Sequence, residues 1–434
     1  MLLGAFGAVV LAAGVAAPDA GQRTVIHAGM LLAIPSQTAE ARQTITIEQG
    51  RIARIESGFA DGSPEDRLID LSCCFVLPGF IDLHVHLTSP VESGGRLRVV
   101  TETAADLAIT AAVFARETLE AGFTTVLDLG TGRRAHEEAI YALRKATAAH
   151  RLPGPRILAV GSPISPIGLS RTGLFRFDVE AVVGPQGVCD GPDDCRRAVR
   201  EQIKRGADAI NFYNTGSLLD EHIVEQTFTD AEMRAIVETA HELGRKVIAD
   251  GHTAPGVNAA LRAGADIVDT MPWPDEVTWR LLGETGAYFV PHLYAFEVSI
   301  GDTEDTLTEG TTAWLPEPIL QRLLSIKRAP YSAEVAHQRG VRIAFGSDTG
   351  VIPHGSNAGE FNELVKAGLS PMDAIVAATL NAARALGLDG EIGSLRPGFV
   401  ADLVAVDGNP LRDIEQLSDI DFVMREGVIY KNRL

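Results

Sequence analysis

Cysteine, aromatic residues and clustered positive charge are all scarce in this chain of 434 residues. It contains four cysteines, and aromatic residues make up only 6% of it. No cysteine pair has C-x-x-C spacing, which argues against a cysteine-based zinc site. Lysine and arginine number 38 against 57 acidic residues, and they form no basic run. A net charge of −19 without a basic patch argues against nucleic acid or an anionic membrane surface as partner.

The few cysteines still suggest one local disulfide. Cys189 and Cys195 flank a short loop, so a bond between them is feasible in an oxidising compartment. Cys73 and Cys74 are adjacent, which disfavours a bond between them. We expect both to pack as small hydrophobic side chains.

Long hydrophobic runs are also missing, apart from the first residues. Residues 1–18 are apolar and small, but the run is too short to predict a retained membrane span. It resembles the apolar part of a secretory signal without the usual positive start. We therefore expect a signal segment over residues 1–20, a periplasmic or secreted protein, and no integral membrane span after processing. If the segment is not a signal, a cytoplasmic location is the alternative.

Both ends of the chain have the pattern of short β-strands. Residues 45–48 and 51–55 alternate in polarity around Gln49-Gly50, which is typical of a β-hairpin. Residues 401–406 and 422–430 have the same texture. We predict a small β-sandwich domain built from both termini, residues 21–77 and 391–434.

The long middle of the chain, residues 78–390, alternates apolar strands with helices. Eight such strand-then-helix units fit an α/β fold of the (β/α)8 TIM barrel type, in which the chemistry lies at the C-terminal ends of the strands. Helices are expected over residues 104–121, 193–205, 230–243 and 371–386. After the strand that leads into residue 84, strands are expected at 124–128, 156–160, 209–212, 246–250, 267–270, 288–291 and 343–346.

The ends of the expected strands carry residues that bind metals. The first strand ends in His84 and His86, and residues i and i+2 of a strand point to the same side. Both imidazoles therefore face one point, and neutral imidazole is the commonest zinc ligand. The eighth strand ends near Asp348. The other polar residues at strand ends are Asn211, Asp250, His252, Asp269, Thr270, His292 and His354.

Motifs spread over most of the chain resemble the amidohydrolase superfamily, and within it the prolidase-like or imidazolonepropionase-like branch. Residues 78–86 are similar to its opening motif, residues 346–350 to its strand-eight motif, and residues 378–384 and 393–403 to its closing helix and strand. The resemblance implies two metals at the barrel mouth. The inner metal is held by the H-x-H pair, a carboxylated lysine after strand four and the strand-eight aspartate. The outer metal is held by the same lysine and by histidines after strands five and six.

This sequence departs from that ligand set at three positions. Asn211 stands at the lysine position, and Asp250 and Thr270 stand at the two histidine positions. Asparagine cannot form a carbamate and threonine is a poor ligand for such a metal, whereas Asp250 could still donate an oxygen. We therefore predict an eroded binuclear site with one divalent inner metal, zinc or alternatively manganese, and no carboxylated lysine. Its ligands would be His84, His86 and Asp348, with Asp250 as a fourth.

The predicted activity is hydrolysis of a C–N bond in a peptide-like or acylated amino-acid small molecule. By resemblance, Asp348 takes a proton from the attacking water and passes it to the leaving nitrogen, and Asp250 is the alternative base. His252, His292 and His354 are candidates for holding the developing oxyanion or a substrate carboxylate.

Other interpretations stay open. The same residues could serve a repurposed non-hydrolytic enzyme, such as an isomerase, lyase or cyclase, or a ligand-binding pseudoenzyme. Asp250 could be a structural carboxylate paired with a histidine, and His292 a satisfied core histidine. A homo-oligomer is also left open.

Overall fold

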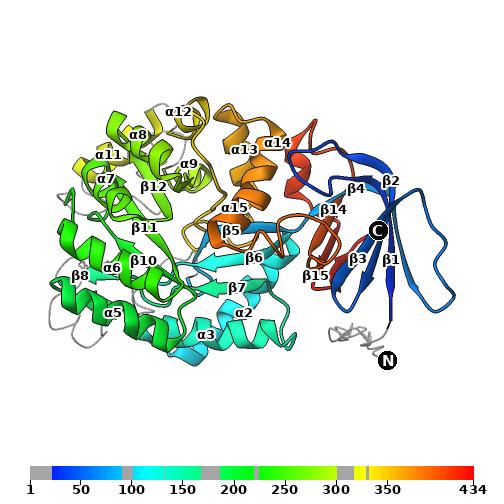
Figure 1. The fold of residues 1–434 in the computed structure, drawn as a ribbon, viewed down its shortest axis with the longest axis horizontal. Helices are drawn as coiled ribbons and strands as arrows, with labels where there is room; N and C mark the ends of the chain where they lie inside the picture. The colour runs from blue at the N-terminus through cyan, green and yellow to red at the C-terminus, as the bar shows by residue number, and fades with distance from the viewer. Residues whose placement is uncertain are drawn as a thin grey trace, which may run out of the picture.

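The structure, a computed structural model, describes residues 22–89, 101–131, 133–167, 186–218, 224–300, 317–328 and 332–434. In Figure 1 the N-terminal strands in blue and the C-terminal strands in red lie together at one end of the molecule. Parallel strands with helices around them make up the rest. The expected signal segment lies outside the described residues. Among those described, no helix is both long and apolar enough to cross a membrane.

Strands from both ends of the chain pair in one seven-stranded sheet. Its order is β16-β15-β14-β4-β1-β2-β3. Strand β4 joins the two halves, because it runs parallel to β1 and antiparallel to β14. The two-layered sandwich stays a prediction, since hydrogen bonds connect all seven strands into one sheet. The strands are β1 (Thr24–Leu31), β2 (Glu40–Glu48), β3 (Arg51–Ser57), β4 (Arg67–Pro78), β14 (Leu403–Val406), β15 (Phe422–Arg425) and β16 (Val428–Asn432).

The predicted hairpin between β2 and β3 is confirmed. Glu48 pairs with Arg51, and the two residues between them, Gln49 and Gly50, both have positive φ, at 51° and 74°. A two-residue turn with two left-handed residues matches the right-handed twist of the flanking strands. The carbonyl of Gly50 also accepts a hydrogen bond from the backbone of Ala401. The hairpin therefore helps to tie the N-terminal strands to the C-terminal segment.

Of the two predictions about the cysteines, one is confirmed and one is wrong. Cys189, in β9 (Val188–Cys189), is bonded to Cys195 in α5 (Pro192–Arg205), as expected. The sulfurs of Cys73 and Cys74 are bonded as well, so the expectation of two separate thiols was wrong. The pairing of β1 with β4 shifts register beside this dipeptide. A bulge breaks the strict alternation of strand side chains and brings the two sulfurs together.

The middle of the chain contains two parallel sheets. One has the order β5-β6-β7 and the other β10-β11-β12-β13. Isolated parallel bridges extend the pairing from Ile164 to Phe212, from Phe289 to Ile343, and from Val85 to Thr349. This α/β arrangement is consistent with a TIM barrel. The strands are β5 (Phe80–Val85), β6 (Phe123–Asp128), β7 (Arg156–Ala159), β10 (Ala209–Tyr213), β11 (Lys246–Thr253), β12 (Ile267–Trp273) and β13 (Tyr288–Val290); a short pair, β8 (Ser165–Pro166) and β9, stands apart.

The eighth expected strand differs from the prediction. Residues 343–349 form single bridges and hydrogen bonds to β13 on one side and β5 on the other, without a regular strand. The backbone N–H of Phe345 instead donates to the carbonyl of Ala377. That carbonyl begins a π-helical segment, η1 (Ala377–Asn381), between α14 (Pro371–Val376) and α15 (Ala382–Leu386). The expected helix over residues 371–386 is therefore present. A π-helical segment lies within it, and the first residue of this segment accepts the hydrogen bond from Phe345.

Helices cover the outer face of the parallel strands. The ends of α2 (Ala104–Glu120) and α6 (Asp230–Glu242) agree closely with prediction, because Thr103 and Thr229 each begin a capping box. The others are α3 (Arg134–Ala148), α5, α7 (Ala254–Ala263), α8 (Glu276–Thr285), α9 (Leu293–Ile300), α11 (Glu317–Arg328), α12 (Ser332–Gln338), α13 (Gly359–Lys366) and a 3-10 helix, η2 (Ile414–Ser418).

Alternate residues of the parallel strands belong to two hydrophobic clusters. One cluster packs residues such as Ile210 and Val268 against the helices. The other contains the residues on the opposite face, away from the helices: Leu127, Ala209, Ile248, Ile267 and Val290. Because strand side chains alternate, residues two positions further along point to this inner face as well. These are the positions that lead into the candidate site.

Candidate active site

His84, His86 and Asp348 bring three ligand atoms together where β5 and the strand-eight segment end. The Nε2 atoms of the two histidines lie 3.0 Å apart. Oδ1 of Asp348 lies 3.2 Å from Nε2 of His84 and 3.4 Å from Nε2 of His86. The pairing of β5 with β6 shifts register between Asp82 and Val85, a stretch that contains the first histidine. The bulge breaks the alternation of the strand there, where both imidazoles turn toward Asp348.

These three residues fit a divalent cation. Ligand atoms around tetrahedral zinc, with bonds of about 2.0–2.2 Å, lie about 3.3 Å from one another. The observed spacing is close to that value, and it is longer than most charge-assisted hydrogen bonds. Oδ1 of Asp348 is buried and accepts no hydrogen bond from the described part of the chain. A cation at the centre would satisfy all three atoms at once.

A further carboxylate, Asp269, joins two of the histidines. Its Oδ2 lies 2.7 Å from Nδ1 of His84, and its Oδ1 lies 2.6 Å from Nε2 of His292. The rings of His84 and His292 meet edge to face with their centres 4.3 Å apart. Asp269 lies two residues after Ile267 on the inner face of β12, and His292 two residues after Val290 at the end of β13. Strand alternation therefore brings this pair to the site.

The charges of neighbouring side chains outweigh burial in setting the pKa values of His84, Asp269 and Asp348. Burial alone would lower the pKa of His84, but the carboxylates of Asp269 and Asp348 raise that pKa well above its ordinary value. Burial would raise the pKa of Asp269 and of Asp348. The neighbouring histidines outweigh it and hold both carboxyl pKa values below the ordinary range. Both carboxylates are therefore ionised at neutral pH, which suits a cationic ligand.

Two buried carboxylates hold the backbone under the histidines. Oδ1 of Asp82 accepts hydrogen bonds from the backbone N–H groups of His84 and Ser347, each at 3.0 Å. It thus ties the strand that carries the histidines to the segment that carries Asp348. Asp128, at the end of β6, accepts from the backbone of Leu87 at 2.8 Å, next to His86. Burial raises the pKa of both carboxyl groups.

The three positions that depart from the family ligand set lie at neighbouring strand ends. Asn211 is 1% exposed, and neither atom of its amide has a hydrogen-bond partner among the described residues. Asp250 is 2% exposed and pairs in register with Asp269 on the adjacent strand. Oγ1 of Thr270 lies 3.4 Å from Nδ1 of His292. An imidazole from β13 therefore stands beside the strand-six position that lacks one.

The remaining candidate histidines have distinct surroundings. Nδ1 of His252 lies 2.9 Å from the carbonyl oxygen of Gly216, which can only accept, so this nitrogen carries a proton. Nε2 of His354 donates to the carbonyl of Ser89 at 3.0 Å, and its ring stacks on Phe114. Burial lowers the pKa of His354 to about 4. The structure thus places His354 as a neutral contact between a loop and α2, outside the three-atom cluster. The catalytic roles assigned to His252, His292 and His354 stay predictions.

Unusual backbone conformations gather at the same strand ends. Thr270, Met271, His292 and Asp348 all have positive φ, between 29° and 75°. Such angles are uncommon for residues other than glycine, and they persist where the surrounding structure holds them. Their clustering at the ends of three neighbouring strands supports a functional constraint at this place.

Asp82, Asp128 and Asp269 are functional candidates that the sequence prediction passed over. Asp269 was noted only as a strand end, and attention fell on Thr270 beside it. A usable signal existed for all three, since each is an acidic residue within an apolar strand. A carboxylate in such a place needs a buried partner. The partner itself is distant in sequence, and only the fold identifies it.

Comparisons with known proteins agree with this geometry. The profile of the Amidohydrolase family matches residues 75–430. Ochratoxinase of Aspergillus niger is 28% identical over 459 aligned positions, which cover 96% of this chain and 88% of that protein. A solved structure of a Xaa-Pro dipeptidase with bound methionine in its active site is 32% identical. It covers 95% of this chain and 100% of its own, with a TM-score of 0.85. A prolidase complexed with N-methylphosphonate-L-proline is 27% identical, with the same coverage of both chains and a TM-score of 0.82.

Proposed function

Because this chain belongs to the Amidohydrolase family, we propose that it hydrolyses a C–N bond in a peptide-like or acylated amino-acid substrate, with a single inner divalent ion. The observation that carries the proposal is the convergence of Nε2 of His84, Nε2 of His86 and Oδ1 of Asp348 at ligand spacing. The names of the similar proteins, a dipeptidase, a prolidase and ochratoxinase, support the substrate class.

The proposed scaffold is a closed (β/α)8 barrel. The bridges from Ile164 to Phe212, from Phe289 to Ile343 and from Val85 to Thr349 support it, because they link the two parallel sheets at both edges. In such a barrel the loops at the C-terminal ends of the strands form the active site. The candidate ligands lie at those ends.

The proposed ligands are His84, His86 and Asp348, with Asp250 as a possible fourth. A bound divalent ion would polarise the substrate carbonyl and lower the pKa of a water molecule beside it. Zinc suits two imidazoles and a carboxylate, and manganese is the alternative. The side chain of Asp348 is 21% exposed, so it can meet both the ion and the mouth of the site.

Asp348 also carries the proposed proton transfer. Its carboxylate takes a proton from the attacking water and gives it to the leaving nitrogen. The backbone contact of Asp82 with Ser347 keeps Asp348 beside the histidines while the proton moves. Asp250 is the alternative base if it does not hold the ion.

The proposed single-ion stoichiometry rests on Asn211, Asp250 and Thr270. An amide cannot bridge two ions as a carboxylated lysine does, and a hydroxyl replaces one imidazole ligand. We expect the Asn211→Lys variant to bind one ion per chain, as the wild type does, because the other two positions still differ. Metal analysis of that variant checks this, and two bound ions would contradict the proposal.

An oxidising compartment is also proposed for this chain. The bond between Cys189 and Cys195 supports it, since disulfides persist mainly outside the reducing cytosol.

A hydrolysis assay tests the proposed function. The purified protein, loaded with zinc, is offered Xaa-Pro dipeptides and N-acylated amino acids, and the released amine is measured. We expect turnover of one class, its loss in a strong chelator, and recovery when zinc returns. Turnover that persists in the chelator would contradict hydrolysis through a bound ion and favour a non-hydrolytic or metal-free enzyme. Tight ligand binding without any turnover would favour a pseudoenzyme.

A further inference from the structure

We propose that Asp269 is a positioning residue whose single carboxylate orients two imidazoles, His84 and His292, and thereby fixes the tautomer in which His84 binds a cation. The inference rests on the proposed function, since it concerns the ligand His84. It adds a residue outside the predicted ligand set and assigns a proton to a stated atom.

Both oxygens of Asp269 are engaged, each by a different histidine. Oδ2 lies 2.7 Å from Nδ1 of His84 and Oδ1 lies 2.6 Å from Nε2 of His292. All three side chains are at most 2% exposed, so water does not compete for these contacts. The contact with His84 is a hydrogen bond, and the contact with His292 is a close ion pair without hydrogen-bond geometry among the described residues.

The proton follows from the chemistry of the carboxylate. An ionised carboxylate only accepts hydrogen bonds, so Nδ1 of His84 must carry the proton. A neutral imidazole then has its lone pair on Nε2, the atom that faces Nε2 of His86 and Oδ1 of Asp348. Carboxylate partners of this kind orient metal-ligating histidines and raise the basicity of the ligand atom.

A cation between Asp269 and its two histidines is the competing interpretation. The three residues do form a second group whose ligand atoms lie near one another. However, their spacings of 2.6 and 2.7 Å are hydrogen-bond lengths, whereas the first group has spacings of 3.0 to 3.4 Å. Ligand atoms around zinc lie about 3.3 Å apart. The shorter spacing therefore separates the group around Asp269 from the ion-binding group.

Packing keeps the two rings in this orientation. His84 and His292 meet edge to face at 4.3 Å. A Cβ atom added to Gly346 would come within 3.2 Å of both Nε2 of His292 and Cβ of His84. The absence of a side chain at this glycine makes room for the pair, and the tight fit hinders rotation of either ring. His292 thus acts on His84 through Asp269 and through direct contact.

Zinc titration of the metal-free full-length protein tests the proposal, with Asp269→Asn as the variant. We expect the variant to bind one zinc per chain with 10- to 100-fold weaker affinity, the usual cost of losing such a partner. Glu360→Gln is the matched control, because it also replaces a buried carboxyl by an amide, at a residue that accepts a backbone hydrogen bond from Tyr294. We expect its zinc affinity to equal that of the wild type.

Nitrogen-15 NMR of the imidazoles reports the tautomer of His84, which would not change if Asp269 had a purely structural role. At a pH high enough to leave the imidazole of His84 neutral, we expect its proton on Nδ1 in the wild type and a mixture of tautomers in Asp269→Asn. Equal zinc affinity of wild type and Asp269→Asn would overturn the inference while leaving the proposed function intact. Failure of the wild type to bind zinc would instead contradict the proposed function. If Asp269→Asn does not fold, the wild-type spectrum at the same pH decides, and a neutral His84 with its proton on Nε2 overturns the inference.

Discussion

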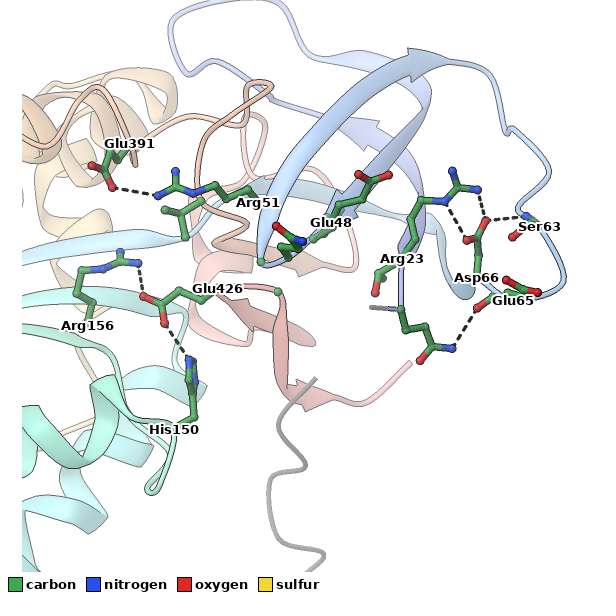
Figure 2. Close-up of a pocket in the computed structure, with 17 residues that line it drawn as sticks. Arg23, Glu48, Arg51, Ser63, Glu65, Asp66, His150, Arg156, Glu391 and Glu426 are labelled. Atoms are coloured by element: carbon green, nitrogen blue, oxygen red, sulfur yellow. Dashed lines mark hydrogen bonds and ion pairs between the residues drawn. The ribbon is translucent and has the colours of Figure 1, made fainter. Parts of the chain in front are cut away.

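Two polar regions of this molecule differ in how their charges are satisfied. One is the candidate site, where His84, His86 and Asp348 converge. The other is a cavity of 1510 Å³ between the terminal sheet and the N-terminal end of β7. Figure 2 shows this junction cavity, with the guanidinium of Arg156 on Glu426, Arg51 facing Glu391 and Arg23 on Asp66.

The junction cavity is large, and the charges of Arg156 and His150 are paired across its walls. Arg156 donates to Asp402 and Glu426 at 2.8 and 2.7 Å, and His150 lies 3.1 Å from the same glutamate. At the candidate site, by contrast, three ligand atoms converge, and Oδ1 of Asp348 is buried without a hydrogen-bond partner among the described residues. The comparison teaches that the convergence of ligand atoms, and not the volume of a cavity, marks the place for chemistry. The junction pairs serve to hold the sheet on the parallel strands.

The largest expected effect is a loss of activity that occurs in the candidate site and not at the junction. Asp348→Asn should lower kcat/KM by about 10²–10⁴-fold, because it removes both an ion ligand and the proposed proton carrier. Asp402→Asn makes the same chemical change at the junction, and there we expect kcat/KM to stay near the wild-type value. Steady-state assays of both variants check this. A comparable loss of kcat/KM in both would remove the distinction between the regions.

We expect the stability of the fold to depend on pH through His354. Burial lowers the pKa of His354 from 6.5 to about 4, so the unfolded chain gains this proton first as the pH falls. The histidine therefore favours the folded state above pH 6.5, and this contribution, about 3 kcal/mol, disappears between pH 6.5 and 4. Urea unfolding at several pH values should show that His354→Gln loses less stability than the wild type as the pH falls. An unchanged pH dependence would mean that His354 is not neutral in the fold.

Loss of a junction pair should change stability and leave catalysis intact. Arg156→Ala leaves Asp402, whose side chain is 5% exposed, without its guanidinium partner. We expect the free energy of unfolding to fall by about 1.5–3 kcal/mol, the range for hydrogen bonds to charged groups. Denaturant midpoints and kcat/KM of the same preparation measure both quantities. A variant with wild-type stability would show that these pairs do not hold the junction.

The smallest effect is expected on an exposed helix face. Arg280 and Glu284 form an i,i+4 pair on α8, with both side chains more than half exposed. Such pairs contribute about 0.3–0.5 kcal/mol, so Arg280→Ala should shift the unfolding midpoint only slightly. Its kcat/KM should equal that of the wild type. A shift as large as that of Arg156→Ala would show that burial does not explain why the two ion pairs contribute differently to stability.

Much of the site followed from local rules of sequence. The spacing of His84 and His86 and the capping residues Thr103 and Thr229 predict features within a few residues of themselves. The strand alternation that carries Ala209 to Asn211 and Ile248 to Asp250 is equally local. For this reason the strand ends and the set of candidate ligands could be predicted.

Features that depend on distant partners or on bulges could not be predicted in this way. Asp269 meets His84 across 185 residues, and no local pattern links them. The bond between Cys73 and Cys74 depends on a register shift in β4, which reverses the ordinary alternation. His354 follows the strand-eight motif closely, yet its loop turns it onto Phe114 and Ser89. In each case the decisive contact is made by the tertiary fold.

The amount of divalent metal bound per chain tests the central claim most directly. Metal-free protein is dialysed against a slight excess of zinc, desalted and analysed by mass spectrometry for metal per chain, with His84→Ala as the control. The account predicts one zinc per wild-type chain and none in the control. Two ions per chain, or none in the wild type, would contradict it.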